Sequence, residues 1–167
     1  MRVFISHSMK DTNLLDALRS ICASTGITPL IAEHSIELQH TITEKIERMI
    51  DGADLVVVAL TKDGFDSQFV QQEIGYAKKA KKPFLLLVEE GLQQKLSGFV
   101  YGRDFITVNP MNLGPTLEKI KVVLSVEKQQ RDRVTATARQ QAEARENFAK
   151  LLLLIIAFIF LAGLSKS

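Results

Sequence analysis

Cysteine is almost absent from this chain of 167 residues, and the single one, Cys22, excludes a disulfide framework within the chain. Cys22 shares a helical spacing with Leu14 and Leu18, so we expect a buried thiol rather than a nucleophile. Histidine is also scarce, and no two of the three histidines have the spacing of metal ligands. We therefore expect no metal site and no metal cofactor.

A strong charge of one sign is lacking too. The formal net charge is +2, and the basic residues are scattered apart from a short cluster at 78–82, so we expect no nucleic-acid partner. The chain has no G-x-G-x-x-G, no G-x-x-x-x-G-K-[ST] and no G-x-S-x-G sequence. These absences exclude the dinucleotide fingerprint, the Walker A loop and the nucleophile elbow. The N-terminal residues MRVFIS have the pattern of a strand, so we expect no secretory signal peptide.

Strand-length apolar runs alternate with amphipathic, helix-length segments along most of the chain. This alternation predicts an α/β fold, with an open parallel sheet covered by helices on both faces. Pro29 suggests an edge position or a bulge for its strand. The predicted strands are residues 2–6, 27–32, 54–61, 83–88 and 105–108, and the predicted helices are residues 11–26, 41–51, 67–82, 91–96 and one that begins near residue 115.

One carboxylate is out of place in the helix predicted for residues 67–82. At about 100° per residue, Glu73 lies inside the apolar arc that Phe69 and Tyr76 define. Burying an unpaired charge is costly. Glu73 therefore needs a buried partner, a cleft or a catalytic role.

The C-terminal part of the chain changes composition twice. Residues 127–147 are polar, contain no glycine or proline, and predict a helical stalk; a disordered linker and a weakly self-associating helix are the alternatives. Residues 151–164 are fourteen consecutive apolar residues. From them we expect a transmembrane anchor over residues 148–165, with a core helix as the alternative.

Basic residues lie mainly before this apolar run, which predicts a single-pass membrane protein with its large domain in the cytoplasm. The expected division of the chain is a folded domain at residues 1–126, the stalk at residues 127–147 and the anchor at residues 148–165. A lipid bilayer is then an expected partner.

Three stretches together carry a family resemblance: VFISHSMKDTNLLDAL, AEHSIELQHTITEKIERMIDGADLVVVALT and SQFVQQEIGYAKKAKKP. In this order they resemble a Toll/interleukin-1 receptor (TIR) domain of the prokaryotic type over roughly residues 1–125. The resemblance implies a flavodoxin-like fold with a five-stranded parallel sheet. Many TIR domains cleave NAD⁺ at the nicotinamide–ribose bond, with a glutamate in an F-V-x-x-E-I context.

The matching position makes Glu73 the expected catalytic residue, and Phe69 an expected substrate-binding residue where the family often has tryptophan. The resemblance places Ser6, His7 and Ser8 in a loop under the nucleotide; a capped turn is the alternative for them.

It also places His34 and Glu37 in a loop that closes over the site, although both could simply be solvated. NAD⁺ is then a substrate and not a cofactor.

The resemblance thus implies a membrane-anchored NAD⁺ glycohydrolase or cyclase in antiviral defence or cell-death signalling, active through self-association of its TIR domains. Two alternatives stay open. One is a non-catalytic TIR adaptor in which Glu73 is a structural residue, and the other is a different N-glycosidic enzyme, such as a nucleoside deoxyribosyltransferase.

Overall fold

The computed structural model describes residues 1–32 and 42–164, without the side chains of residues 99, 155 and 157–164. By its contacts the chain divides into two units, Met1–Lys128 and Gln129–Ser167. The first unit holds the sheet and the candidate site, and the second holds the C-terminal part of one long helix.

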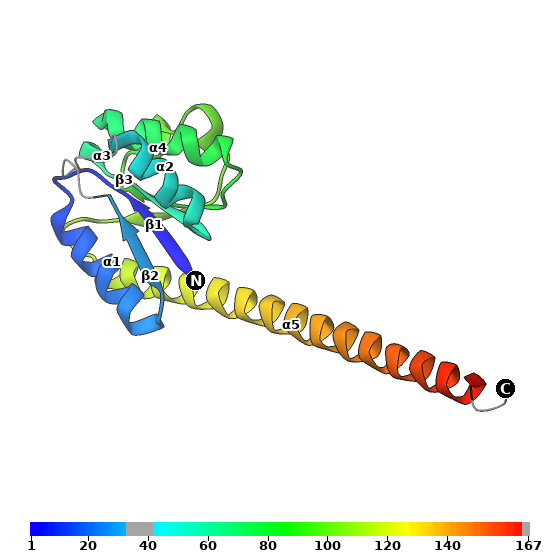
Figure 1. The fold of residues 1–167 in the computed structure, drawn as a ribbon. Helices are drawn as coiled ribbons and strands as arrows, with labels where there is room; N and C mark the ends of the chain where they lie inside the picture. Colours follow the sequence, from blue (N-terminus) through cyan, green and yellow to red (C-terminus); the bar gives the residue numbers. More distant parts are fainter. Residues whose placement is uncertain (33–41, 165–167) are drawn as a thin grey trace. The chain divides into compact units, whose positions relative to one another are not determined.

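The first unit is built on a five-stranded sheet in which all neighbouring strands are parallel (Figure 1). The strand order is β2-β1-β3-β4-β5, which is the flavodoxin-like order. This confirms the predicted fold, and β2, which contains Pro29, is an edge strand as expected. The strands are β1 Arg2–Ser6, β2 Thr28–Ile31, β3 Leu55–Leu60, β4 Phe84–Glu89 and β5 Phe105–Val108.

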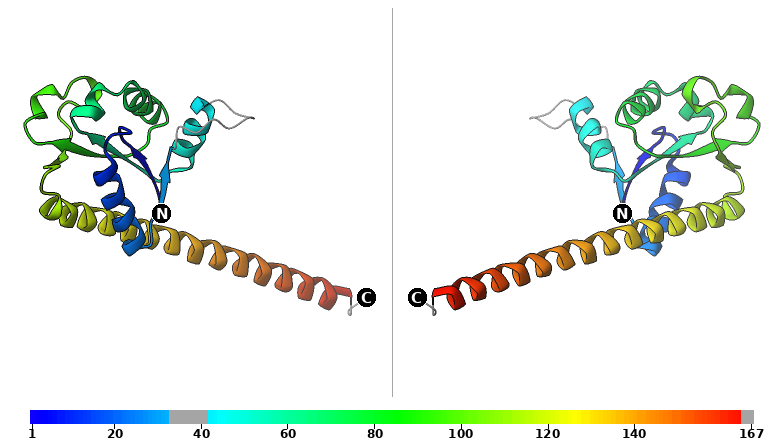
Figure 2. Two further views of the ribbon diagram at one scale, coloured as in Figure 1. Left: turned by 90° about the vertical axis from the view of Figure 1, so that its left-hand side faces the viewer. Right: turned by 90° about the vertical axis from the view of Figure 1, so that its right-hand side faces the viewer.

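Helices cover both faces of the sheet. The two buried clusters show that α2 and α4 pack on one face, while α1 and the first turns of α5 pack on the other. Figure 2 shows α1 and α2 separated by β1 and β2. The α-helices are α1 Thr12–Thr25, α2 Ile42–Gly52, α3 Lys62–Asp66, α4 Gln68–Lys79 and α5 Gly114–Leu164, and two 3₁₀ turns are η1 Gln93–Lys95 and η2 Gly98–Val100.

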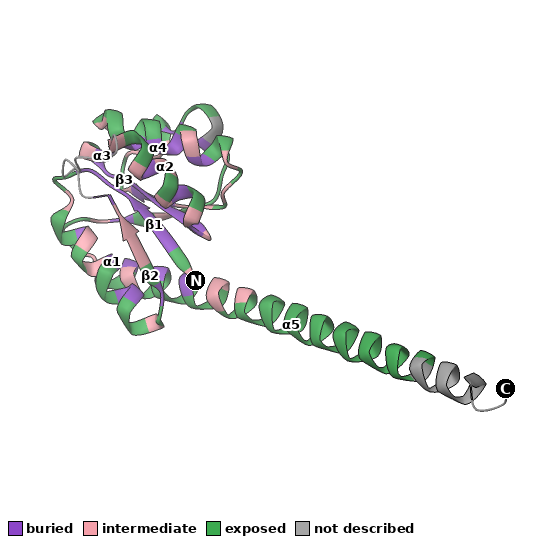
Figure 3. Cartoon of the chain, viewed as in Figure 1, coloured by how far each residue is buried: buried purple, intermediate pink, exposed green. Residues whose placement is uncertain are grey.

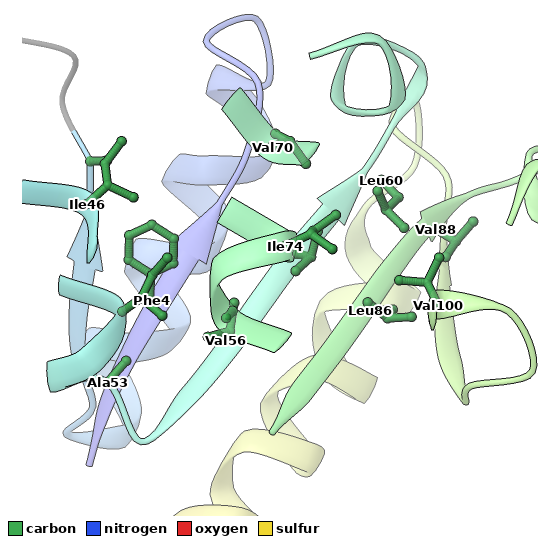
Figure 4. Packing of buried hydrophobic residues seen from close by; sticks show 14 of the residues in the cluster. Phe4, Ile46, Ala53, Val56, Leu60, Val70, Ile74, Leu86, Val88 and Val100 are labelled. Carbon is green, nitrogen blue, oxygen red and sulfur yellow. The ribbon is translucent and has the colours of Figure 1, made fainter. Parts of the chain in front are cut away.

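The core follows the alternation of side chains along buried strands. In β3, Val56, Val58 and Leu60 face the cluster beneath α2 and α4, whereas Leu55, Val57 and Ala59 face the other cluster. Because both faces are covered, all six residues of β3 are buried, which is why its sequence is a continuous apolar run. Figure 4 shows side chains from β1, β3, β4, α2 and α4 meeting in the first cluster, and Figure 3 shows burial concentrated in the strands.

Local signals explain several helix ends. Gly26 ends α1 in the left-handed conformation with a φ of 64°, as its position predicts. The hydroxyl of Ser67 accepts a hydrogen bond from the backbone N–H of Val70 at 3.4 Å and so caps α4. Thr41 and Glu44 have the spacing of a capping box before α2, but Thr41 lies outside the described residues.

Asp11 has the residue type and the position of an N-cap for α1, but the structure shows a different role. It precedes α1, but its side chain makes no capping hydrogen bond to that helix. Its carboxylate accepts instead from the backbone N–H of Ser8 at 3.1 Å and from the hydroxyl of Thr61 at 2.9 Å. Asp11 thus connects the turn after β1 to Thr61, the residue that follows β3. Its carboxylate is engaged by these two hydrogen bonds and does not cap α1.

The short helix α3 was not predicted, since five residues are too few to show a helical period. It needs glycine at position 64. A Cβ there would lie 2.2 Å from the backbone oxygen of Ala59, a distance that no side chain can tolerate. The predicted helix at 91–96 is the shorter turn η1.

The helix α5 begins as predicted and continues through residues 127–147 without a break. In the first unit Ile120 and Leu124 are fully buried. In the second unit residues 132–150 are all exposed. Residues 127–147 are therefore helical, and their assignment as a stalk stays a prediction.

The predicted membrane anchor is wrong. Among the residues that the structure describes, no helix combines the length and the apolar character needed to span a bilayer. The physical reason is length, because fourteen apolar residues extend only about 21 Å as a helix and a hydrocarbon core is about 30 Å thick. The transmembrane assignment of residues 148–165 and the single-pass localisation are corrected accordingly, whereas the lipid partner is not tested by this finding.

Candidate active site

The sheet topology indicates where a ligand site belongs. Parallel sheets of this strand order bind ligands beyond the carboxyl ends of the strands, where connections diverge between β1 and β3. Ser6 is the last residue of β1 and is in register with Val58 of β3. The candidate site is built around this residue.

Glu73 reaches the site from α4. The cap at Ser67 fixes the start of the helix, and one helical face then places Val70, Glu73, Ile74 and Ala77 against the sheet. The side chain of Ser6 lies on the same face of the sheet, because it alternates with Ile5 along β1. Its hydroxyl donates a hydrogen bond of 2.5 Å to Oε2 of Glu73, and Glu73 is only 4% exposed.

Burial dominates the electrostatics of this carboxyl group. Removal from water raises the pKa of Glu73 to about 7, and the hydrogen bond from Ser6 opposes that rise by favouring the charged form. Within the described residues, the ion pairs do not include Glu73. The misplaced glutamate is therefore held by a hydroxyl and not by a buried cation, and near neutral pH it populates both protonation states.

A cavity of about 700 Å³ opens beside Glu73, between α2 and α4. Its volume lies in the range of ligand pockets, roughly 300–1,000 Å³. Phe69 precedes Glu73 by one helical turn, lines the same cavity and is 45% exposed, so its ring is accessible to a ligand. The other lining residues used below are Glu47 of α2 and Gly75, Tyr76 and Lys79 of α4.

His7 and Ser8 are buried in the turn after β1, but they do not line this cavity. Nδ1 of His7 donates to the backbone oxygen of Ile5 at 3.2 Å. The backbone N–H of Ser8 is bound by Asp11, and its hydroxyl accepts from the N–H of Lys10 at 3.4 Å. These contacts hold the turn together, and the substrate-binding role expected for His7 and Ser8 stays a prediction.

The structure thus brings three of the six predicted site residues together, Ser6, Phe69 and Glu73. His34, like Glu37, lies outside the described residues. Sequence reasoning missed Tyr76 as a cavity residue, although its position three residues after Glu73 and seven after Phe69 puts all three on one side of α4. From the sequence, Tyr76 was used only to define the apolar arc of the helix, so no ligand-binding role was predicted for it.

Comparisons with known proteins agree with this fold. A family model described as "TIR domain" matches residues 3–111. No curated protein matches the chain. Among solved structures, that of the Clostridium botulinum CMP N-glycosidase BcmB is similar, with a TM-score of 0.53, 18% sequence identity, and coverage of 72% of this chain and 98% of the other. At this identity the similarity concerns the fold.

Proposed function

Since this chain belongs to the TIR domain family, whose model matches more than half of its length, we propose that it cleaves the nicotinamide–ribose bond of NAD⁺. The observation that carries the proposal is a buried carboxyl group, Glu73, on the wall of a cavity large enough for a nucleotide. The catalytic residue is Glu73, and Ser6 positions it.

The reaction breaks one bond and forms one. The C1′–N bond of NAD⁺ breaks with both electrons going to the pyridinium nitrogen, which gives neutral nicotinamide. Water adds to C1′ and releases a proton, which gives ADP-ribose. If a nitrogen of the adenine adds in place of water, the product is a cyclic isomer. The leaving group needs no proton, because it departs with its positive charge neutralised.

What the enzyme must stabilise is the positive charge that develops on the ribose, as in glycoside hydrolysis. A carboxylate held in an apolar wall acts strongly on such a charge, because little water is present to screen it. Glu73 meets this requirement in its ionised form. The cationic nicotinamide ring also favours ionisation of Glu73 when substrate is bound.

Ser6 and Phe69 have distinct roles in this proposal. The hydroxyl of Ser6 donates to Oε2 of Glu73, so it fixes the position of the carboxylate. Phe69 lies one turn away along α4 and offers a ring face for the nicotinamide. Phenylalanine stacks on such a ring but, unlike tryptophan, donates no hydrogen bond.

The test is release of nicotinamide from NAD⁺, followed by chromatography and mass spectrometry of the products. We expect Glu73→Gln to lower kcat by about 100-fold or more, because removal of one charge-stabilising group typically costs 10²–10³ in rate. Glu90→Gln is the matched control, since Glu90 is an exposed glutamate outside the cavity. Equal background rates for the wild type and Glu73→Gln would leave the chain a non-catalytic TIR adaptor.

A second candidate is cleavage of a nucleoside monophosphate, which the similarity to a CMP N-glycosidase favours. Cytosine leaves as an anion unless it is protonated, so this reaction needs an acid. The protonated form of Glu73, with its pKa of about 7, can supply that proton. The pH dependence separates the two reactions: below neutrality, NAD⁺ cleavage falls as pH falls, whereas acid-assisted CMP cleavage persists.

A further inference from the structure

The cavity beside Glu73 extends along α4 well beyond the reacting bond. Phe69 and Tyr76 both line it, and seven residues separate them. On a helix this spacing leaves the two rings on one side, about 10.5 Å apart along the axis. Glu73 lies between them. The groove therefore has an aromatic side chain on each side of the acid.

Tyr76 is held in place from the neighbouring helix. Its hydroxyl donates to Oδ2 of Asp51, at the end of α2, at 2.9 Å. The ammonium group of Lys79 lies 6.0 Å from the centroid of its ring, at the outer limit of a cation–π contact. The hydroxyl is thus occupied, whereas the contact over the ring is weak enough for a ligand to displace.

The charges around Tyr76 favour one kind of ligand. Asp51 and Glu47 both face it, and both contribute to the raised pKa of its hydroxyl. Lys79 is the cation beside it that also lines the cavity. Lys82 is a second cation nearby, since its ammonium group donates to the backbone oxygen of Asp51 at 2.6 Å. The charges around Tyr76 therefore nearly cancel, which gives no net attraction for a phosphate. A neutral, flat heterocycle fits, because it stacks on the ring and any exocyclic amino group can donate to a carboxylate.

We propose that Tyr76 forms a second nucleobase subsite, which binds the base of an extended dinucleotide that lies across Glu73 from the reacting base. This inference rests on the proposed function, for which it names the substrate class. The placement supports it, because Phe69 and Tyr76 line the same cavity on either side of Glu73, so the two bases of one substrate can lie at separate positions along α4. The two rings of the substrate are therefore held apart, with the ribose and diphosphate between them.

The experiment compares Tyr76→Leu and Tyr76→Phe with the wild type on two substrates. NAD⁺ carries both bases, and nicotinamide mononucleotide lacks the adenine. We expect Tyr76→Leu to raise the KM for NAD⁺ by roughly 10- to 100-fold, the equivalent of one stacked base. The kcat for NAD⁺ and the kinetics with nicotinamide mononucleotide stay within about threefold. Tyr76→Phe retains the ring and stays close to the wild type on both substrates.

Tyr101→Leu is the matched control, since Tyr101 is the other tyrosine, is 76% exposed and does not line the cavity. Equal effects of Tyr76→Leu on both substrates, or none on either, overturn the subsite. Thermal unfolding of each variant identifies a loss of folding. If Tyr76→Leu does not fold, the kinetics of Tyr76→Phe and the binding of ADP to the wild type test the subsite.

Calorimetric binding of ADP, which cannot turn over, separates this inference from the proposed function. Binding to the wild type that weakens at least tenfold in Tyr76→Leu supports the subsite even if no nicotinamide is released. No binding of ADP to the wild type overturns the subsite even if NAD⁺ is cleaved.

Discussion

At the scale of single residues, Glu73 has a cost for the fold as well as a proposed role in catalysis. Its pKa rises from 4.5 to about 7 on folding, mainly because burial disfavours the charged form. The folded state therefore binds this proton more tightly than the unfolded chain. The associated stability is fully present below pH 4.5 and is lost as pH rises through about 7. Ionising the acid that the reaction needs thus destabilises the protein.

This predicts that Glu73→Gln unfolds at a higher temperature than the wild type at pH 8. The shift of pKa corresponds to a loss of up to about 3 kcal/mol in the free energy of unfolding when Glu73 ionises. Glutamine does not ionise, so the variant avoids this loss. The difference in melting temperature should shrink as pH falls toward 4.5. Thermal unfolding followed by circular dichroism between pH 4.5 and pH 8 measures it. A difference that is constant across this range contradicts the assignment of the raised pKa to Glu73.

Ser6 should set the pH dependence of the reaction. Its hydrogen bond favours the ionised form of Glu73, so Ser6→Ala raises the pKa of that carboxyl group further. The acid limb of kcat/KM for NAD⁺ should then move to higher pH by about one to two units, since a hydrogen bond to a charged group contributes about 1.5–3 kcal/mol.

The matched control is Ser20→Ala, because the hydroxyl of Ser20 is exposed and donates to the backbone oxygen of Asp16. It should leave the profile unchanged. A uniform loss of rate in Ser6→Ala, with no displacement along the pH axis, would assign Ser6 a merely structural part.

At the scale of elements, α4 connects the core to the cavity. Its inner face is buried, while Gly75 is exposed in the middle of the helix, and a Cβ there would meet no atom within 4 Å. Gly75 also lines the cavity that contains Glu73 and a second one of about 480 Å³ on the other flank of the helix. A small residue here weakens the helix and widens the groove.

Gly75→Ala should therefore stabilise the protein by up to about 1 kcal/mol, because alanine favours the helix and lowers the conformational entropy of the unfolded chain. For a chain of this length the melting temperature rises by roughly 2–4 °C. The added methyl group enters the groove, so the KM for NAD⁺ should rise while kcat changes little. Lower stability in this variant contradicts the open space beside Gly75.

The sequence predicted elements whose signal is local and continuous. The strands β3 and β4 appear as apolar runs because both faces of the sheet are covered. The burial of Glu73 followed from its angle on α4. The contact between Ser6 and Glu73 did not, since it joins residues 67 positions apart in the chain. The cavity could not be predicted from the sequence either, because it depends on how far apart α2 and α4 lie and not on any single residue.

At the scale of the whole molecule, both buried clusters are confined to residues of the first unit. A chain that ends at Lys128 should then fold with a melting temperature within a few degrees of the full chain, as differential scanning calorimetry would measure. A loss of cooperative unfolding in the shortened chain would show that the second unit contributes to the core.

Self-association stays a prediction of the family resemblance, and the same two chains test it. If TIR domains associate to act, the specific activity for NAD⁺ increases with protein concentration in both chains. If residues 129–167 drive association, the increase is lost on shortening. A specific activity independent of concentration in both chains would make the single protomer the active unit, as a subsite at Tyr76 allows.

The hydrogen bond from Ser6 to Glu73 has a consequence for redesign. Glu73 is held by Ser6, the last residue of the central strand β1, whereas side chains of α2 and α4 line the groove. The acid thus shares α4 with part of the groove wall, but Ser6, which holds the acid, lies on β1 and does not line the groove. Exchanging the wall residues other than Glu73 should change which glycosidic substrate binds, while the hydrogen bond from Ser6 keeps the carboxyl group in place.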